Sequence, residues 1–372
     1  MRLPLNDLKQ AYLSAAEEID TVVSAAISSG WWLNGEQTRN FCSLFAAYLK
    51  TSHCIGVGNG TDALEIAMRA LLALRGGSRN EVVTVANAGG YSTIAIRQIG
   101  LTPVYADIEE SSQLGSISSM IEAMGPDTAL VVVTHLYGGV LDVFSLRQRM
   151  DAAGYAHVPI LEDCAQAHGA VLSGHKVGTI GDIGAFSFYP TKNLGAFGDA
   201  GAIVSSNDEL AKTCDSLRQY GWAQKYDVAQ SGGRNSRMDE VQAAILSIQL
   251  KRLDKANERR VSIIDRYAAV CPEGAAIVRS PLGNVGHLAV LLTDHREALR
   301  AHFAECEIAT DIHYPILDCD QTGWKGLPQK LAPGGLTVAR RSVSRLLTVP
   351  CFPGMTDNEV NAVCDALTSF SL

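Results

Sequence analysis

Short apolar runs alternate with amphipathic segments through the first two thirds of the chain. Seven runs have the length and composition of β-strands: residues 54–58, 81–85, 103–107, 129–134, 158–162, 184–188 and 201–205. Several are apolar almost throughout, which is typical of strands that helices cover on both faces. Amphipathic segments at residues 62–74, 117–124 and 145–153 separate some of them. This alternation predicts right-handed crossovers and a mainly parallel sheet in an α/β domain.

The N-terminal region has a helical pattern instead. Apolar residues recur three or four apart through the first thirty residues, which predicts one helix with a single apolar face. A turn at Trp31 and Trp32 then leads into a second predicted helix at residues 36–49. We interpret the tryptophan pair as local core. The alternative is a dimer contact, because aromatic side chains concentrate at the centres of interfaces.

After residue 205, strand-like runs no longer alternate regularly with helical segments. Helical patterns cover residues 208–220, 238–256 and 356–368, and strand-like runs cover residues 287–292 and 309–313. We therefore predict a large domain of residues 1–250 and a smaller C-terminal α/β domain of residues 251–372.

Composition narrows the class of protein. The 372 residues are 47% hydrophobic and 19% charged, which excludes a disordered chain. The net charge of -8, without a cluster of Lys and Arg, argues against nucleic acid as a partner. Nine scattered cysteines without a Cys-x-x-Cys pair favour reduced thiols and no metal site. No signal-peptide pattern and no membrane-length apolar run is present, so we expect a cytoplasmic protein without a membrane partner.

A glycine-rich turn at residues 56–64 connects a predicted strand to a predicted helix. Unpaired backbone N–H groups at a helix N-terminus, together with the helix dipole, form an anion site. The turn is neither a Walker loop nor a dinucleotide fingerprint, and ordinary strand–helix turns are also glycine-rich. Ser187, at the end of another predicted strand, could add a hydroxyl group to a phosphate site.

Two residues at the ends of predicted strands could carry chemistry. Lys192 lies in a short loop between Pro190 and Gly195, where an amine could form a Schiff base with a carbonyl cofactor. Asp163 ends a buried strand, where ligands bind in such sheets. Taken singly, a loop lysine is most often a solvated charge and such an aspartate a helix cap. His168 is interpreted as a packed histidine rather than as a base.

In combination, these segments make the sequence resemble a known family. Four motifs carry the resemblance, namely residues 60–64, 162–169, 186–195 and 235–240. They are similar to the motifs of the pyridoxal-phosphate-dependent sugar aminotransferases of the DegT/DnrJ/EryC1/StrS family, and the similarity covers almost the whole chain. The resemblance implies the aspartate-aminotransferase fold (fold type I), with a mainly parallel seven-stranded sheet, and a homodimer with sites at the interface.

The resemblance also implies roles for single residues. Lys192 matches the Schiff-base lysine and proton shuttle, Asp163 the partner of the pyridinium nitrogen, and Gln166 the group near the cofactor's phenolic oxygen. The phosphate cradle is matched by Gly60, Thr61, Asp62 and Ser187. Asn235 matches an asparagine that reaches the cofactor of the neighbouring subunit, which would make dimerisation a condition of activity.

Two segments depart from the family pattern. Residues 86–93 lack the usual proline and threonine–aromatic pair, so Tyr91 becomes the candidate for stacking on the cofactor ring. Residues 316–321 stand where many relatives have a histidine. Just before them, His313 and Tyr314 are candidate substrate-binding residues, although a strand-end histidine and tyrosine are as often ordinary surface residues. The sequence of residues 313–315 resembles that of enzymes acting at C3 of the sugar more than that of enzymes acting at C4.

The implied reaction moves an amino group from an amino acid, with glutamate as the expected donor, to a keto carbon of a nucleotide-linked 6-deoxyhexose. One alternative is a relative that acts on a cyclitol ketone or forms an aromatic amine. A sugar dehydratase of this family would have histidine in place of Lys192, which counts against that assignment. A non-catalytic regulator on the same fold is the remaining alternative, and the complete catalytic set argues against it.

Overall fold

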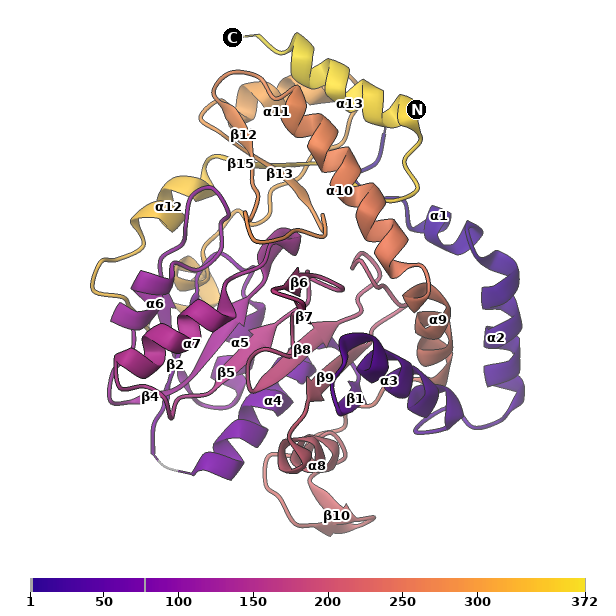
Figure 1. The fold of residues 1–372 in the computed structure, drawn as a ribbon, viewed down its shortest axis with the longest axis vertical. Helices are drawn as coiled ribbons and strands as arrows, with labels where there is room; N and C mark the ends of the chain where they lie inside the picture. Colours follow the sequence, from indigo (N-terminus) through magenta and orange to yellow (C-terminus); the bar gives the residue numbers. More distant parts are fainter. Residues whose placement is uncertain (1–2, 77, 372) are drawn as a thin grey trace.

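The computed structural model describes residues 3–76 and 78–371, and a twisted eight-stranded sheet forms its centre (Figure 1). In spatial order the strands are β1 (His53–Val57), β9 (Gly201–Ser205), β8 (Ile183–Ser187), β5 (Ile160–Asp163), β4 (Thr128–Thr134), β2 (Glu81–Val85), β3 (Thr102–Ala106) and β14 (Lys330–Leu331). Only β9 runs antiparallel to its neighbours, β1 and β8. The predicted α/β fold of type I is confirmed.

All seven strands predicted from apolar runs are present, with ends shifted by at most two residues. The eighth strand corrects the expected number. β14 comes from the C-terminal part of the chain and pairs in parallel with β3 through Lys330 and Leu331. Both of its residues are exposed, so no apolar run marks it in the sequence.

Alternating strand residues face two layers of helices. Val82, Leu130 and Val132 pack against α4 (Gly60–Arg75), α5 (Tyr91–Gln98) and α8 (Asp208–Leu217). Val83 and Val131, one residue further along, pack on the opposite face, which α6 (Ile117–Glu122) and α7 (Val143–Ala152) cover. Because both faces are buried, the strands read as continuous apolar runs.

The N-terminal region differs from its prediction in two ways. The expected single helix is two helices, α1 (Leu8–Leu13) and α2 (Ala16–Ser28), with a break at Ser14 and Ala15. Trp31 and Trp32, interpreted as local core, are 65% and 61% exposed, so that interpretation is wrong. α3 (Glu36–Leu49) forms as predicted and buries Phe41 and Phe45 against the sheet.

A second, smaller sheet lies beyond the main one (Figure 1). Its antiparallel strands are β12 (Ala275–Ile277), β13 (Ala289–Thr293) and β15 (Leu346–Val349). The predicted helix at residues 238–256 is two helices, α9 (Glu240–Leu250) and α10 (Leu253–Ala269). The predicted strand at residues 309–313 is wrong, because only Asp311 forms a bridge there, with Thr348.

The remaining elements surround these two sheets. The helices are α11 (Arg296–Glu305), α12 (Thr337–Val343) and α13 (Asp357–Ser369), and two short hairpins pair β6 (Val171–Leu172) with β7 (His175–Lys176) and β10 (Trp222–Gln224) with β11 (Asp227–Val228). In the part of the chain that the structure describes, no helix is long and apolar enough to cross a membrane. The boundary at residue 250 stays a prediction, and β14 shows that the later segment also contributes to the main sheet.

Candidate active site

A cavity of about 620 Å³ lies where β5 and β8 end and α4 begins. Its wall includes all of the residues predicted from the sequence except Asp62 and Asn235, namely Gly60, Thr61, Tyr91, Asp163, Gln166, Ser187, Lys192, His313 and Tyr314. These residues are far apart in the sequence, from the turn between β1 and α4 to the loop at residues 313–314 that precedes β14. The C-terminal ends of parallel strands meet at one edge of a sheet, which is why the motifs converge there.

Lys192 enters this cavity from the loop between β8 and β9. Its backbone N–H donates to the carbonyl oxygen of Tyr189 at 2.8 Å, which closes a turn at Pro190. Burial lowers the pKa of Lys192 to about 8, while the charge of Asp163 acts in the opposite direction. About a tenth of the amine is therefore unprotonated at pH 7, far more than for a lysine with its ordinary pKa, and a nucleophilic or basic lysine needs that neutral form.

We expect a pH signature from this lysine. Only the neutral amine attacks an aldehyde, so the rate at which the cofactor-free protein captures pyridoxal phosphate should rise with pH and level off above about 8. Stopped-flow absorbance between pH 6 and pH 10 measures this rate. A rate that keeps rising to pH 10 in the same way as that of a small primary amine would contradict the lowered pKa.

Asp163 is the last residue of β5 and is buried in the cavity wall. Its Oδ1 accepts a hydrogen bond from the backbone N–H of Ala165 at 3.2 Å, and its Oδ2 accepts one from Ser92 Oγ at 3.2 Å. Burial raises the pKa of Asp163, and these two donors and Lys192 oppose that rise. The sequence did not indicate Ser92, because its contact depends on how α5 packs across the sheet.

The cavity end next to α4 has the features of an anion site. No hydrogen bond within the described residues uses the backbone N–H groups of Gly60 and Thr61, which begin the helix. A Cβ atom at Gly60 would lie 2.5 Å from the Cβ of Ser187, so the close approach of β8 requires glycine there. Two backbone donors, the Ser187 hydroxyl group and a helix N-terminus together fit a phosphate group.

Two tyrosines border the middle of the cavity. Tyr91 begins α5 and is 49% exposed, and its ring centroid lies 6.5 Å from that of Tyr314 in an edge-to-face arrangement. Tyr314 packs directly on Gly89, where a Cβ atom would lie 2.9 Å from Cε1 of its ring. Gln166 Nε2 donates to the Tyr314 hydroxyl group at 2.9 Å. The stacking role of Tyr91 stays a prediction, and Tyr314 is a second aromatic ring at this position.

The two histidines considered in the sequence have different surroundings. His313 lines the cavity and its Nδ1 lies 2.9 Å from Thr348 Oγ1, and burial lowers its pKa. His168 lies outside the cavity wall between the rings of Phe186 and Phe188, and burial lowers its pKa to about 3. His168 is thus packed, as we predicted, but neither of its ring nitrogens has a hydrogen-bond partner within the described residues.

Two of the predicted site residues, Asp62 and Asn235, lie outside the cavity wall. The Asp62 carboxylate lies 3.1 Å from Nη1 of Arg234, and its backbone N–H donates to Asn59 Oδ1 at 2.8 Å. Asp62 does not line the cavity, and its assignment to the phosphate cradle stays a prediction. Asn235 also lies outside the cavity of its own chain, and its predicted reach to a neighbouring subunit stays a prediction.

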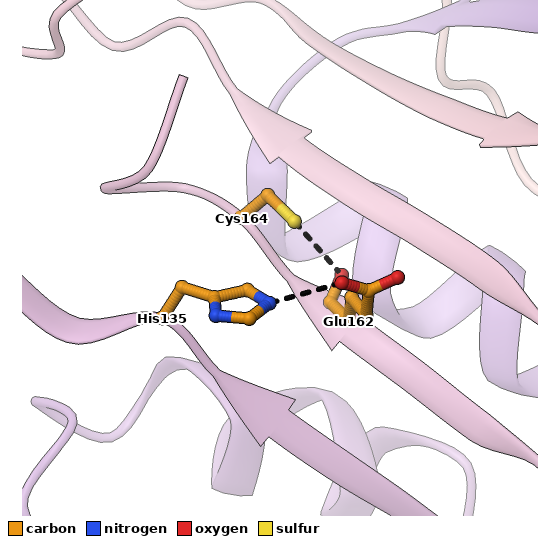
Figure 2. A group of neighbouring side chains, drawn as sticks. All are labelled: His135, Glu162 and Cys164. Carbon is orange, nitrogen blue, oxygen red and sulfur yellow. Dashed lines mark hydrogen bonds and ion pairs between the residues drawn. The ribbon is translucent and has the colours of Figure 1, made fainter. Parts of the chain in front are cut away.

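Beneath Asp163, a buried polar cluster joins His135, Glu162 and Cys164 (Figure 2). Glu162 Oε2 accepts a hydrogen bond from His135 Nε2 at 3.0 Å, because His135 Nδ1 already accepts one from the backbone of Leu141. Both Glu162 oxygens also accept backbone N–H groups from residues 178–181. With these atoms occupied, the cluster does not fit a metal ion, and it fixes the loop at residues 178–181 to β5.

Replacing Glu162 with glutamine should therefore lower the free energy of unfolding by about 2–4 kcal/mol. The amide NH2 group would face N–H donors and leave them without an acceptor in a buried site. Burial by itself would raise the pKa of Glu162, but the interaction with His135 and the N–H groups of Gly181 and Gly178 lower it. The stabilisation is accordingly present above the pKa of an unfolded glutamate and is lost as the pH falls through the lowered folded value.

Urea unfolding of the two proteins measures this difference. The exposed Glu122→Gln variant is the matched control and should unfold like the wild type. If Glu162→Gln also unfolds like the wild type, the cluster does not stabilise the fold.

The comparisons with known proteins agree with this geometry. The model of the DegT/DnrJ/EryC1/StrS aminotransferase family matches residues 14–368. The erythromycin biosynthesis sensory transduction protein EryC1 of Saccharopolyspora erythraea is 36% identical over 371 residues, covering 99% of both chains. The dTDP-3-amino-3,6-dideoxy-alpha-D-galactopyranose transaminase of Aneurinibacillus thermoaerophilus is also 36% identical, again over 99% of both chains. The crystal structure of Streptomyces venezuelae DesV, in complex with a ketimine intermediate, superimposes with a TM-score of 0.92 at 35% identity, covering 99% of this chain and 98% of that one.

Proposed function

Because the chain belongs to the DegT/DnrJ/EryC1/StrS aminotransferase family, whose enzymes depend on pyridoxal phosphate, we propose that it transfers an amino group from an amino acid to a keto carbon of a nucleotide-linked sugar. One observation carries the proposal. A lysine whose pKa is lowered to about 8 and a buried aspartate share one cavity with a helix N-terminus suited to a phosphate group. That combination fits this cofactor.

The residues divide the binding of the cofactor among them. Lys192 would hold its aldehyde carbon through the Nζ atom, and Gly60, Thr61 and Ser187 would bind its phosphate group. Asp163 would pair with the ring nitrogen, and the hydroxyl group of Ser92 orients that carboxylate. When bound, the cofactor supplies an electron sink for the carbon atom that loses a proton.

The protein then controls protons at two atoms. With the cofactor bound, Lys192 Nζ would be the group that takes the proton from the donor's α-carbon and later returns a proton to the carbon that receives the amino group. Its lowered pKa suits both steps, because it can accept and release a proton near neutral pH. An ionised Asp163 would place a negative charge beside the ring nitrogen and so favour a proton on that atom.

We propose L-glutamate as the donor and C3 of a keto-6-deoxyhexose as the acceptor carbon. The 3-amino sugar in the name of the Aneurinibacillus relative supports C3. His313 and Tyr314 lie at the cavity wall, where they could contact the sugar. The product would serve in the biosynthesis of an amino-deoxysugar, with a bacterial O-antigen or lipopolysaccharide as one destination.

The active form is proposed to be a cytoplasmic homodimer with its sites at the interface. Aromatic side chains with large exposed fractions support this, among them Trp31, Trp32 and Tyr226. Asn235, which does not reach the cavity of its own chain, supports it independently.

A substrate panel tests the assignment. Purified protein with pyridoxal phosphate and glutamate is offered 3-keto and 4-keto nucleotide sugars and a cyclitol ketone, and the products are identified by mass spectrometry and NMR. An amine at C3 of a nucleotide sugar is expected. If only the cyclitol ketone is aminated, the sugar assignment fails and transamination stands. If glutamate is not converted with any acceptor, the regulatory alternative gains support.

A further inference from the structure

The loop that carries Asn235 is tied to the start of α4 by buried charges. Nη1 of Arg234 lies 3.1 Å from Asp62 Oδ1 and also contacts Glu65 Oε2. Nε of Arg69 donates to the other Glu65 oxygen at 2.9 Å. Asp62 and Glu65 are only 7% and 4% exposed, so these pairs are shielded from water and are worth more than surface pairs.

Backbone hydrogen bonds fix both neighbours of Asn235 as well. The N–H of Arg234 donates to the carbonyl oxygen of Leu217 at 2.8 Å, and the N–H of Ser236 donates to that of Arg218 at 2.9 Å. The Ser236 hydroxyl group accepts a hydrogen bond from the N–H of Gly58 at 2.9 Å, at the end of β1. The backbone at Asn235 thus has one defined position relative to α4.

The side chain of Asn235 has no such support. Across residues 3–76 and 78–371 it makes no hydrogen bond, and it does not line the cavity of its own chain. A rigidly held backbone that presents a polar side chain without an internal partner is suited to an external ligand.

Asp62 itself cannot serve a phosphate group directly. A carboxylate beside a bound phosphate group would repel it, since like charges at short distance are unfavourable. Arg234 compensates this charge in the structure. The side chain of Asp62 therefore acts on the loop of Asn235 and not on the cavity that α4 begins.

We propose that Asp62 and Glu65 are positioning residues for the partner subunit's site: through Arg234 they fix Asn235, which extends into the cavity of the other copy of this chain. The inference rests on the proposed function, because it requires a dimer in which Asn235 crosses the interface. It predicts that a substitution at Asp62 weakens the site of the other subunit and leaves the site of its own subunit intact.

Hybrid dimers test this direction. Two chains with different affinity tags are co-expressed, and dimers with one copy of each are purified over two columns. In every hybrid one chain carries Lys192→Ala, so a single site retains its lysine. Two quantities are measured at that site: turnover, and the dissociation constant of pyridoxal phosphate from borohydride-reducible absorbance, which reports only sites with Lys192.

The Asp62→Asn homodimer should bind the cofactor about tenfold more weakly than the wild type and turn over about 10–100-fold more slowly. A hybrid of Asp62→Asn with Lys192→Ala should recover wild-type cofactor affinity and half of the wild-type turnover, because its loop comes from the chain with Asp62. A hybrid of wild type with the Asp62→Asn, Lys192→Ala double variant should keep the defect.

The opposite pattern, in which the site is impaired only when Asp62→Asn and Lys192 are on the same chain, would overturn the inference. Asp62 would then act on the phosphate site of its own chain. An Asp62→Asn homodimer without any defect would also overturn it. The hybrid of Asn235→Ala with Lys192→Ala tests the crossing of Asn235 by itself, because its one intact Lys192 can receive Asn235 only from the other chain. If this hybrid is inactive, Asn235 does not cross the dimer interface, and the inference fails. Arg234→Met in the same combinations gives the same test should Asp62→Asn not fold.

Discussion

Replacing Lys192 with alanine is expected to abolish the visible absorbance that borohydride can remove, and to lower turnover on the order of 10⁴-fold. The side chain supplies both the covalent attachment of the cofactor and the group that moves the proton. No other lysine lines this cavity among the described residues, so none can take over either role. The fold should remain, because Lys192 makes no side-chain hydrogen bond or ion pair in the described part of the chain.

The exposed Lys212 on α8 offers a matched control, and Lys212→Ala should keep wild-type absorbance and turnover. Added methylamine should restore part of the turnover of Lys192→Ala, because a small amine can enter the space left by the side chain. If Lys192→Ala retains the borohydride-sensitive absorbance, another amine holds the cofactor and the assignment of the site is wrong.

The main sheet could be predicted from the sequence because both of its faces are buried. Several of its strands are apolar almost throughout and therefore show no helical period. In β2, for example, all five residues are buried and three of them are valine. β14 gave no such signal, since Lys330 and Leu331 are exposed and pair with β3 only through the backbone. The break between α1 and α2 was also missed, because the apolar spacing continues through it.

Site residues could be predicted only where one short segment contains the residue types that the proposed chemistry needs. Lys192, Asp163 and Gln166 stand in short segments whose residue types match their roles, and the sheet brings those segments together. Ser92 and Arg234 were not indicated, because each acts on a residue from a distant segment, Asp163 and Asp62 respectively. The ion pair of Asp62 could not be predicted for the same reason, because its partner Arg234 lies far away in the sequence.

The departure at residues 86–93 has a structural explanation. Gly89 and Gly90 both have positive φ, and Cβ atoms there would lie 2.9 Å from the ring of Tyr314 and 3.2 Å from that of Trp324. A side chain at either position would push the segment at residues 314–324 away from the cavity. The glycine pair thus removes an aromatic residue from the first segment and allows Tyr314 to approach from the second.

Replacing Asp163 with asparagine should separate binding of the cofactor from its use. The amide keeps the shape of the carboxylate. Its oxygen can still accept from the N–H of Ala165, and its NH2 group can donate to the Ser92 hydroxyl oxygen once that hydroxyl group rotates. It cannot hold a negative charge, so a proton on the cofactor's ring nitrogen is no longer stabilised. We expect turnover to fall about 10²–10³-fold, while the borohydride-reducible absorbance remains, because Lys192 is still present.

The exposed Asp151→Asn variant on α7 is the control and should behave like the wild type. Steady-state kinetics and absorbance on the same samples give both quantities. The contrast with Lys192→Ala carries the argument, since that variant loses absorbance and turnover together. If Asp163→Asn turns over like the wild type, the ring nitrogen does not depend on a negative charge at this position. Asp163 would then be a structural residue at the end of β5, and the electron sink would need another source of stabilisation.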